Sequence, residues 1–504
     1  MIARGDRRSV GRGGKPGGGA AGGLILWTTL LAAGCGADAA GPAPAPDVAP
    51  SGAAVAASGV TISPSSVSLD GIGATYTFSV TVLGRNGQPI SSPKVSWASL
   101  EPAVAAVDRN GKVTAVGGGT ARITAASGKA ADTAVVQVVV AASSPAAPGG
   151  GSGYSPPSSI AADCSTDVTT ALNGWIASVP DSSTVSFGAG ACYRVDGGLV
   201  VADRNGLTFE GNGATFRVFT KGAPDRANWT IRGGAGITFR NMIVRGANPN
   251  AGTQDAAYDT SVEWQHGFAF QGTQTALLDS VQVYDVYGDF AEAQHDPRVT
   301  FPGQPVRNLT VRNGRFERNG RMGFGLTHVD GFVLRDSYVG GVRWSAVDVE
   351  LNDASEVGRN IQVLHNTFGA VRHSLLSNGG AGAEPNVGSI EFSSNIMAAD
   401  PLTCIAPIDI APPSGQYRSG FTFRQNQLRV YGAAVTLTRA RNVTVDGNSL
   451  DFLSGGGCSQ GTTGVYAADS HVGGVTNNTL TAASAVFKAD PLTTDFTVSG
   501  NTMR

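Results

Sequence analysis

Charged side chains are scarce in this sequence. Asp, Glu, Lys and Arg make up 15% of its 504 residues, and 36 basic residues against 38 acidic ones give a formal net charge of -2. A protein that binds nucleic acid normally carries a basic excess or a basic patch, because it must neutralise phosphates. The balance of charge therefore predicts no nucleic-acid partner. The length exceeds that of one compact domain, so two or three structural units are expected.

Long hydrophobic runs are lacking as well. The apolar stretch near the N-terminus, LILWTTLLAA (24–33), is too short to span a bilayer but suits the hydrophobic region of a signal peptide. It ends in LLAAGC, which resembles a bacterial lipoprotein signal with Cys35 as the lipidated residue. The resemblance implies a signal peptide at 1–35, a lipid anchor in a membrane, and an exported outer-membrane or cell-surface lipoprotein. Ordinary secretion with an incidental cysteine is the alternative.

Cysteine is rare, with five in the chain. Setting Cys35 aside leaves an even number, which in an exported protein indicates two disulfide bonds, most simply Cys164–Cys192 and Cys404–Cys458. These cysteines lack the CxxC type of spacing that zinc sites use, so a zinc site is not expected.

Glycine, in contrast, is abundant, with 70 residues. Together with many Val, Thr, Ser and Asn residues, it favours β-structure with frequent turns over helices. Two linkers divide the chain, one rich in Pro and Ala at 36–58 and one rich in Gly, Pro and Ser at 141–159. They separate a short segment, 59–140, from a long one, 160–504.

Residues 59–140 carry short runs of alternating apolar and polar residues, such as TYTFSVTV and ARITA. About seven short strands in about eighty residues fit a small β-sandwich. The succession of Trp97, VD at 107–108, NG at 110–111 and GTA at 119–121 resembles the bacterial immunoglobulin-like group 2 family. The resemblance implies a surface spacer or adhesion unit, and Trp97 is expected in its core.

Residues 160–504 contain a repeat in which an Asn or Asp is flanked by apolar residues, as in VLHNTF, FRQNQL and VDGNSL. The polar residue falls at positions 336, 366, 395, 426, 448, 478 and 501, with upstream equivalents at Asn212, Met242, Val281 and Gly314. Spacings of roughly 22 to 31 residues are typical of a solenoid that keeps its strands and varies its loops. Apolar residues two apart, such as Val443 and Val445, should point inward and stack between rungs. The Asn should sit at a bend in left-handed conformation, with its amide bonded to the next rung.

Leu172, Trp175, Ile176 and Val179 predict a short amphipathic helix ahead of the first rung. With the repeat, this segment resembles pectate-lyase-like right-handed β-helix proteins across residues 160–504. The resemblance implies an all-β fold, a right-handed parallel β-helix solenoid with an N-terminal capping helix, preceded by the small immunoglobulin-like β-sandwich. That family includes polysaccharide lyases, glycoside hydrolases, epimerases, phage tailspikes and adhesins. No active-site motif of a lyase or polygalacturonase is recognisable, so the fold does not choose the chemistry.

The stretch RWSAVDVELND (343–353) places two acids two residues apart. With Val347 and Val349 inward, Asp348 and Glu350 should both face solvent, roughly 6.5 to 7 Å apart at the backbone. Solvated surface acids are the alternative interpretation. Arg343 precedes the strand and a histidine precedes the strand of the next rung. The candidate catalytic residues are Asp348, Glu350, Arg343 and His373.

Further polar residues gather on the same rungs. Long loops on a solenoid build the wall of a groove. Two insertions should bring seven polar or aromatic residues toward one end, namely Trp264, His266, Asp289, Glu292, His295, Asp296 and Arg298. Two more arginines precede strands in the way Arg343 does, and strand alignment adds one Asn beside the acids and one Asp further along the column. The predicted substrate-binding residues are Trp264, Asp289, His295, Arg321, Arg372, Asn378 and Asp409.

Two chemistries fit this set. In glycoside hydrolysis one carboxylic acid protonates the leaving oxygen while a second, about 6.5 to 9.5 Å away in inverting enzymes, activates water, and Asp348 with Glu350 or with Asp409 suits this range. In β-elimination on a uronic acid, His373 or His295 would be the base, and Arg343 and Arg372 would neutralise the carboxylate. Asp348, Glu350 and Asp409 would then offer hard oxygen ligands to Ca²⁺.

The sequence therefore predicts an exported, surface-anchored protein that acts on a polysaccharide as a hydrolase or a lyase. A non-catalytic adhesin that binds a cell-surface glycan is the alternative, because the same spacer and anchor would serve it. Ca²⁺ is the candidate cofactor, and neither interpretation requires another.

Overall fold

The computed structural model describes residues 57–64, 66–70, 73–102, 104–116, 119–139, 153–382, 384–454 and 461–504. The predicted signal peptide with Cys35, most of both predicted linkers, and Cys458 lie outside these residues. Within the described ranges, no helix combines the length and the apolar character needed to cross a membrane.

The first described part, residues 57–139, is a small β-sandwich. Its strands pair in the orders β2-β9-β8-β5, β3-β7-β6 and β1-β4. The strands are β1 (Ala57–Ser63), β2 (Ser66–Asp70), β3 (Thr75–Thr77), β4 (Ser79–Gly84), β5 (Ser96–Ser99), β6 (Ala105–Val107), β7 (Lys112–Ala115), β8 (Gly119–Ser127) and β9 (Ala130–Val139). Val113, Ile123 and Val136 are buried in its core, and the Trp97 ring packs against that core, stacked on Phe78. Trp97 is half-buried, so it packs against the core rather than inside it.

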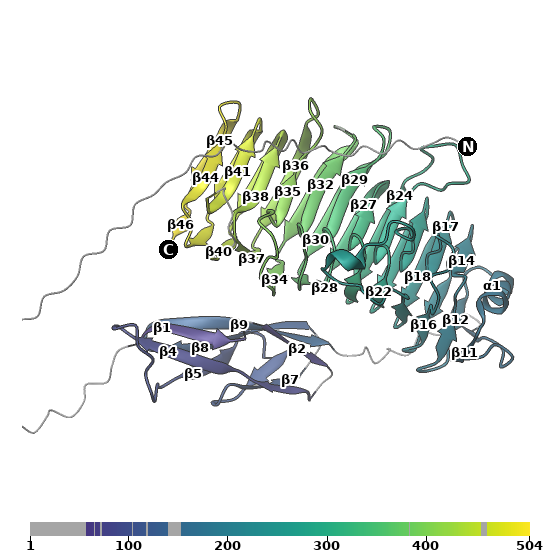
Figure 1. Ribbon diagram of the computed structural model, residues 1–504, viewed down its shortest axis with the longest axis horizontal. Helices are drawn as coiled ribbons and strands as arrows, with labels where there is room; N and C mark the ends of the chain where they lie inside the picture. The colour runs from purple at the N-terminus through teal and green to yellow at the C-terminus, as the bar shows by residue number, and fades with distance from the viewer. Residues whose placement is uncertain are drawn as a thin grey trace, which may run out of the picture. The chain divides into compact units, whose positions relative to one another are not determined.

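The second part is a right-handed parallel β-helix, in which strands of successive rungs stack into three long sheets (Figure 1). In the described residues these sheets have 13, 13 and 11 strands. The first sheet consists of β10 (Gly153–Tyr154), β12 (Thr184–Ser186), β15 (Thr208–Glu210), β18 (Ala235–Arg240), β21 (Gln274–Asp279), β24 (Val306–Arg312), β27 (Val329–Arg335), β30 (Gly358–Leu364), β33 (Val387–Ser393), β36 (Arg418–Arg424), β39 (Ala440–Asp446), β42 (His471–Thr476) and β45 (Thr494–Ser499).

The second and third sheets follow the same order. The second consists of β11 (Asp163–Asp167), β13 (Cys192–Arg194), β16 (Thr215–Arg217), β19 (Ile243–Arg245), β22 (Gln282–Val286), β25 (Arg315–Asn319), β28 (Tyr338–Gly340), β31 (Thr367–Phe368), β34 (Ile396–Met397), β37 (Gln427–Val430), β40 (Ser449–Phe452), β43 (Thr479–Thr481) and β46 (Thr502–Met503). The third consists of β14 (Leu199–Ala202), β17 (Trp229–Arg232), β20 (Phe268–Gln271), β23 (Ala291–Gln294), β26 (Phe324–Leu326), β29 (Val347–Leu351), β32 (Leu376–Gly380), β35 (Ile408–Ile410), β38 (Ala433–Thr438), β41 (Thr463–Ala468) and β44 (Ala485–Ala489). The predicted fold class is confirmed.

The core of the solenoid is a continuous stack of apolar side chains. Parallel register sets Phe421 beside Val443 and Phe423 beside Val445, and all four are buried. Successive residues of a strand point to opposite faces, so one face of each sheet fills the interior while the other faces outward. The predicted inward stacking of alternate apolar residues is therefore confirmed.

A ladder of asparagines runs along one corner of the solenoid. The main-chain and side-chain amides of Asn395 both donate to Oδ1 of Asn426, at 3.0 and 3.2 Å. The same pattern links Asn366, Asn395, Asn426, Asn448, Asn478 and Asn501. The predicted bond from each Asn amide to the next rung is confirmed.

The left-handed residue of each corner precedes the ladder residue, contrary to the prediction. His365 and Gln425, for example, have φ values of 56° and 54°. Asp336 itself has a φ of 50°, so Ser337, whose amide donates to Asn366, occupies the ladder position on that rung. The left-handed residue turns the chain, and the residue after it can then direct its side chain along the stack.

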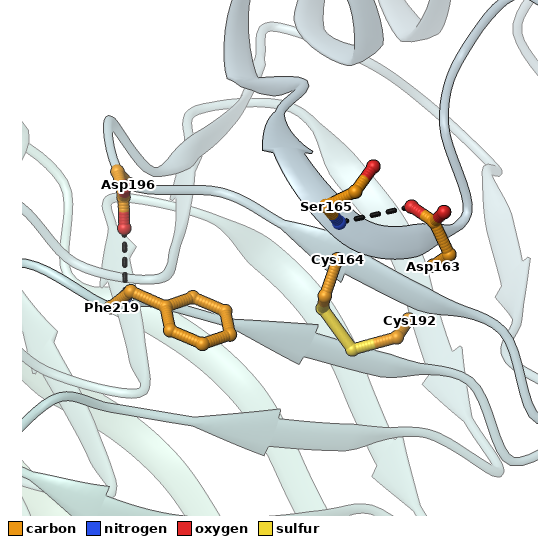
Figure 2. The surroundings of a disulfide bond; sticks show 6 residues. All are labelled: Asp163, Cys164, Ser165, Cys192, Asp196 and Phe219. Atoms are coloured by element: carbon orange, nitrogen blue, oxygen red, sulfur yellow. Dashed lines mark hydrogen bonds between the residues drawn. A yellow bond between two sulfur atoms is a disulfide. The ribbon is translucent and has the colours of Figure 1, made fainter.

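A helix and a disulfide bond stand at the N-terminal end of the solenoid. Helix α1 (Thr169–Ser178) lies beside β14 and buries Leu172 and Ile176, as the spacing predicts (Figure 1). The predicted Cys164–Cys192 bond ties β11 to β13 (Figure 2). Cys404 is also disulfide-bonded.

Candidate functional site

A line of outward residues crosses five neighbouring strands of the third sheet. Parallel register sets Glu292, Gly325, Asp348, Ser377 and Asp409 side by side in that order. Neighbouring strands lie about 4.8 Å apart, so Asp348 stands about 9.5 Å, between Cα atoms, from Glu292 on one side and from Asp409 on the other. We call these five residues the acidic column.

Asp348 and Glu350 share the outward face of β29 but not the same environment. Glu350 is exposed, whereas Asp348 is only 6% exposed, so the prediction that both face solvent is wrong for Asp348. The Ser377 hydroxyl donates a hydrogen bond to Asp348 from one side. On the other side Gly325 has no side chain, and the carboxylate of Asp289 fills the space, 2.4 Å from where a Cβ would stand.

This environment favours the protonated form of the Asp348 carboxyl. Burial, and then the charge of Glu350, raise the pKa of Asp348 to about 7, while the hydrogen bond from Ser377 acts in the opposite direction. The two acids also share a hydrogen bond. They are therefore too close to flank a water molecule, which needs a separation of about 6.5 to 9.5 Å. Glu350 acts on Asp348 as a neighbouring charge rather than as a separate partner.

Arg321 connects the acidic column to the insertion between β19 and β20. Its NH1 lies 2.9 Å from Oδ2 of Asp289, and its guanidinium carbon lies 5.2 Å from the centre of the Trp264 ring. Burial raises the pKa of Asp289 to about 6, against the charge of Arg321. The structure thus brings together three predicted binding residues, Trp264, Asp289 and Arg321.

His266, Asp289 and Glu292 form the one group in the described part of the chain whose ligand atoms come within 4.8 Å of one another, as a metal site requires. Nε2 of His266 lies 2.9 Å from Oε2 of Glu292, while Nδ1 accepts a hydrogen bond from the main-chain amide of Asp289. That bond uses the lone pair of Nδ1, so the proton of the neutral ring is on Nε2, facing Glu292. Neither ring nitrogen is free for a metal, and we assign none.

Two influences on His266 oppose each other. Burial acts to lower the pKa of His266, and the carboxylates of Glu292 and Asp289 outweigh it and raise that pKa. A doubly protonated ring would, however, set the N–H of Nδ1 against the Asp289 amide. The hydrogen bond from the Asp289 amide to Nδ1 therefore favours the neutral ring. The predicted Ca²⁺ ligands, Asp348, Glu350 and Asp409, do not form a comparable group among the described residues.

The other predicted arginines belong to a second cluster. NH2 of Arg343 and NH1 of Arg372 lie 2.6 and 2.7 Å from Oδ1 of Asp255, in the short helix η1 (Asp255–Ala257). His373 contacts the Trp344 ring edge-on, at 4.4 Å between centroids. Burial, followed by the charges of Arg343 and Arg372, lowers the pKa of His373. We call Arg343, Arg372, Asp255, Trp344 and His373 the arginine cluster.

Asn378 lies inside the solenoid rather than in the column. Register pairs it with Val349, an inward residue, and its side chain is fully buried. Its side-chain oxygen accepts a hydrogen bond from Arg418, which is also fully buried. The alternation in HSLLSN (373–378) therefore begins one residue later than predicted, and Ser377 takes the outward position.

His295 follows strand β23, and Asp409 is the last residue of the acidic column. Nδ1 of His295 lies 3.8 Å from Oε1 of Glu356, and the charge of His295 acts on Glu292. Asp409 is half-buried and accepts a hydrogen bond from the hydroxyl of Thr436, the next residue of its line. Asp409 is thus where the sequence placed it, one strand beyond β32.

Sequence reasoning missed three residues of these clusters. Ser377 was missed because the predicted alignment of this strand with β29 was wrong by one residue. Asp255 is one of three acids in a long insertion, and no local pattern separates it from the others. Trp344 directly follows Arg343 in RWSAVDVELND, and this adjacency to a candidate residue could have identified it.

Comparison with known proteins bears on each part separately. Residues 56–138 match the family Bacterial Ig-like domain (group 2), which confirms the predicted resemblance of this segment. No curated protein matches the chain.

Solved structures similar to the chain include three β-helix proteins. The surface adhesin PfbA of Streptococcus pneumoniae is 13% identical over 66% of this chain and 91% of its own, with a TM-score of 0.45. The family 28 exopolygalacturonase of Yersinia enterocolitica is 11% identical over 86% and 97%, with a TM-score of 0.44. The GH87 alpha-1,3-glucanase of Streptomyces thermodiastaticus is 15% identical over 88% and 83%, with a TM-score of 0.42. The likeness is one of fold.

Proposed function

We propose that this protein is an exported polysaccharide hydrolase in which Asp348 donates a proton to the leaving glycosidic oxygen. The observation that carries the proposal is the buried Asp348 carboxyl on the outward face of the third sheet, with a pKa raised by burial to about 7. A general acid needs a pKa near the working pH, so that it is protonated yet able to give the proton up.

Asp409 is the proposed base that activates water. It lies two strands from Asp348, about 9.5 Å between Cα atoms, which suits the carboxyl separation of about 6.5 to 9.5 Å in inverting enzymes. In this mechanism the Asp348 proton passes to the leaving oxygen as the glycosidic bond breaks. Asp409 takes a proton from the attacking water, and the product has the opposite anomeric configuration.

The contacts of the arginines favour hydrolysis over β-elimination. An elimination site needs a cation free to neutralise the uronate carboxylate of the substrate. Arg321, the arginine whose charge acts on Asp348, is held by the buried carboxylate of Asp289, and Arg343 and Arg372 belong to the arginine cluster rather than to the acidic column.

The N-terminal parts fit an enzyme held outside the cell. The proposed lipid anchor at Cys35 would fix the chain to a membrane, and the immunoglobulin-like segment would serve as a spacer. The proposed substrate is therefore an extracellular polysaccharide or a cell-surface glycan.

The test is turnover by the purified protein on plant, algal and bacterial polysaccharides. We expect new reducing ends without the ultraviolet absorbance of unsaturated products, and an inverted anomer in the first product by NMR. Asp348→Asn and Asp409→Asn should each lower kcat at least a hundredfold, since removal of a general acid or base costs about 10²- to 10⁴-fold. Glu391→Gln on the first sheet is the control and should leave the rate unchanged.

If the products show the ultraviolet absorbance of unsaturated sugars, the reaction is β-elimination and not hydrolysis. Glycan binding without turnover, equal in wild type and Asp348→Asn, would make the protein an adhesin.

A further inference from the structure

Arg343 and Arg372 place two positive charges around one carboxylate. Both guanidinium groups contact the same oxygen of Asp255, Oδ1. Among the described residues, Asp255 is the one acid that forms an ion pair with either arginine. The three side chains therefore carry a net charge of about +1 by this count.

Two hydrogen-bond donors of the Arg343 side chain are unused. Its side chain is 7% exposed, and its Nε and NH1 have no acceptor among the described residues. A buried donor without a partner costs free energy, and more so when it is charged. The guanidinium is held over the Trp344 ring, 4.3 Å from its centre, so the unused donors have a fixed direction. A planar fork of this kind suits a carboxylate or a sulfate.

Asp255 can leave this position at little cost. Its side chain is 78% exposed, so its departure uncovers no apolar surface of its own. An ion pair with one strongly exposed partner adds little to the stability of a protein, because water competes for both charges. A ligand anion with access to the unused donors of Arg343 would make the stronger contact.

We propose that Arg343 and Arg372 form a subsite for an anionic group of an acidic polysaccharide, and that Asp255 is the chain's own occupant, which this group displaces. The proposal deepens the proposed function and rests on it for the position of the cleavage point. Arg343 precedes Asp348 by five residues on the same rung, so their Cα atoms lie at most about 18 Å apart. A carboxylate and a sulfate share the required chemistry, and the test separates them.

The test is calorimetric binding to the purified protein carrying Asp348→Asn, so that no turnover is needed. The probes are trigalacturonate, a sulfated carrageenan tetrasaccharide without carboxylates, and neutral cellotetraose. We expect at least one charged probe to bind more tightly than the neutral one. Arg372→Gln should weaken that binding at least tenfold, and Asp255→Asn should strengthen it about fivefold, because it removes the competing carboxylate.

Asp336→Asn is the matched control, because Asp336 also forms an exposed ion pair, with Arg335. It should leave binding of every probe unchanged. Equal affinities for charged and neutral probes in all variants would overturn the subsite. So would an Asp255→Asn protein that melts at lower temperature without any gain in affinity, which would make Asp255 a loop anchor only. Failure of the proposed function would be seen in a separate assay: turnover by the Asp348→Asn protein would contradict the role of Asp348 as general acid.

Discussion

Asp348 and Glu350 stand two positions apart in one strand, yet only one of them meets solvent. The difference comes from neighbours on other rungs, where Ser377 covers Asp348 on one side and Asp289 extends over Gly325 on the other. At the scale of a residue, the chemistry of the site therefore depends on what lies one strand away.

Stability should reflect the proton held by Asp348. The unfolded chain releases this proton near the ordinary value of 3.8 and the folded chain near 7, so between these values the folded protein binds the extra proton. Stability from this group is complete below about pH 4 and is lost as pH rises to about 7. We expect Asp348→Asn to gain stability relative to wild type between pH 4 and pH 8, by up to about 4 kcal/mol.

The free energy of unfolding in urea, measured for both proteins at pH 4 and at pH 8, gives this change. Glu391→Gln should show no such trend relative to wild type. Parallel pH profiles for wild type and Asp348→Asn would contradict a raised pKa at Asp348.

The asparagine ladder shows how an element is held together. The Asn395 side chain accepts a hydrogen bond from the Asn366 amide, and it donates to the Val363 carbonyl and to Oδ1 of Asn426, so one side chain serves three rungs. Hydrogen bonds of this kind in a buried corner are costly to leave unmade.

We expect Asn395→Ala to destabilise the β-helix by about 3 kcal/mol, because the Asn366 amide and the Val363 carbonyl would lose their partner. The shift of the denaturant midpoint measures the loss. Thr422→Ala, an outward residue of the neighbouring strand β36, should cost less than about 0.5 kcal/mol. A midpoint for Asn395→Ala equal to that of Thr422→Ala would mean that water replaces the ladder bonds.

At the scale of the molecule, the chain holds two separate cores. One cluster of buried apolar residues is drawn from the β-sandwich, with Val113 and Ile123 among them, and the other from the β-helix, with Phe209 and Phe324 among them. Each part can therefore bury its own apolar surface.

We expect a fragment of residues 153–504 to fold alone, because its core takes no residue from the sandwich. It should match the full chain within about 1 kcal/mol in stability and twofold in any turnover. Circular dichroism during thermal unfolding and the reducing-end assay measure both. A fragment that aggregates or melts early would show that the sandwich contributes to the stability of the β-helix.

The sequence determined the fold almost completely. Strand alternation, the recurring Asn and the spacing of Leu172 and Ile176 are local patterns, and they record the inward face, the corner and the capping helix directly. They also fixed the Cys164–Cys192 bond and the position of Asp409 in its column.

The tertiary structure alone decided which of these residues share an environment. The positions of Asn378 and Asp336 depended on where a turn ends, and a shift of one residue reverses the face of a strand. The burial of Asp348, the contact of Arg321 with Asp289 and the capture of Arg343 and Arg372 by Asp255 join residues from different rungs and insertions. Such contacts depend on the stacking of rungs and the path of long loops, which no local pattern encodes.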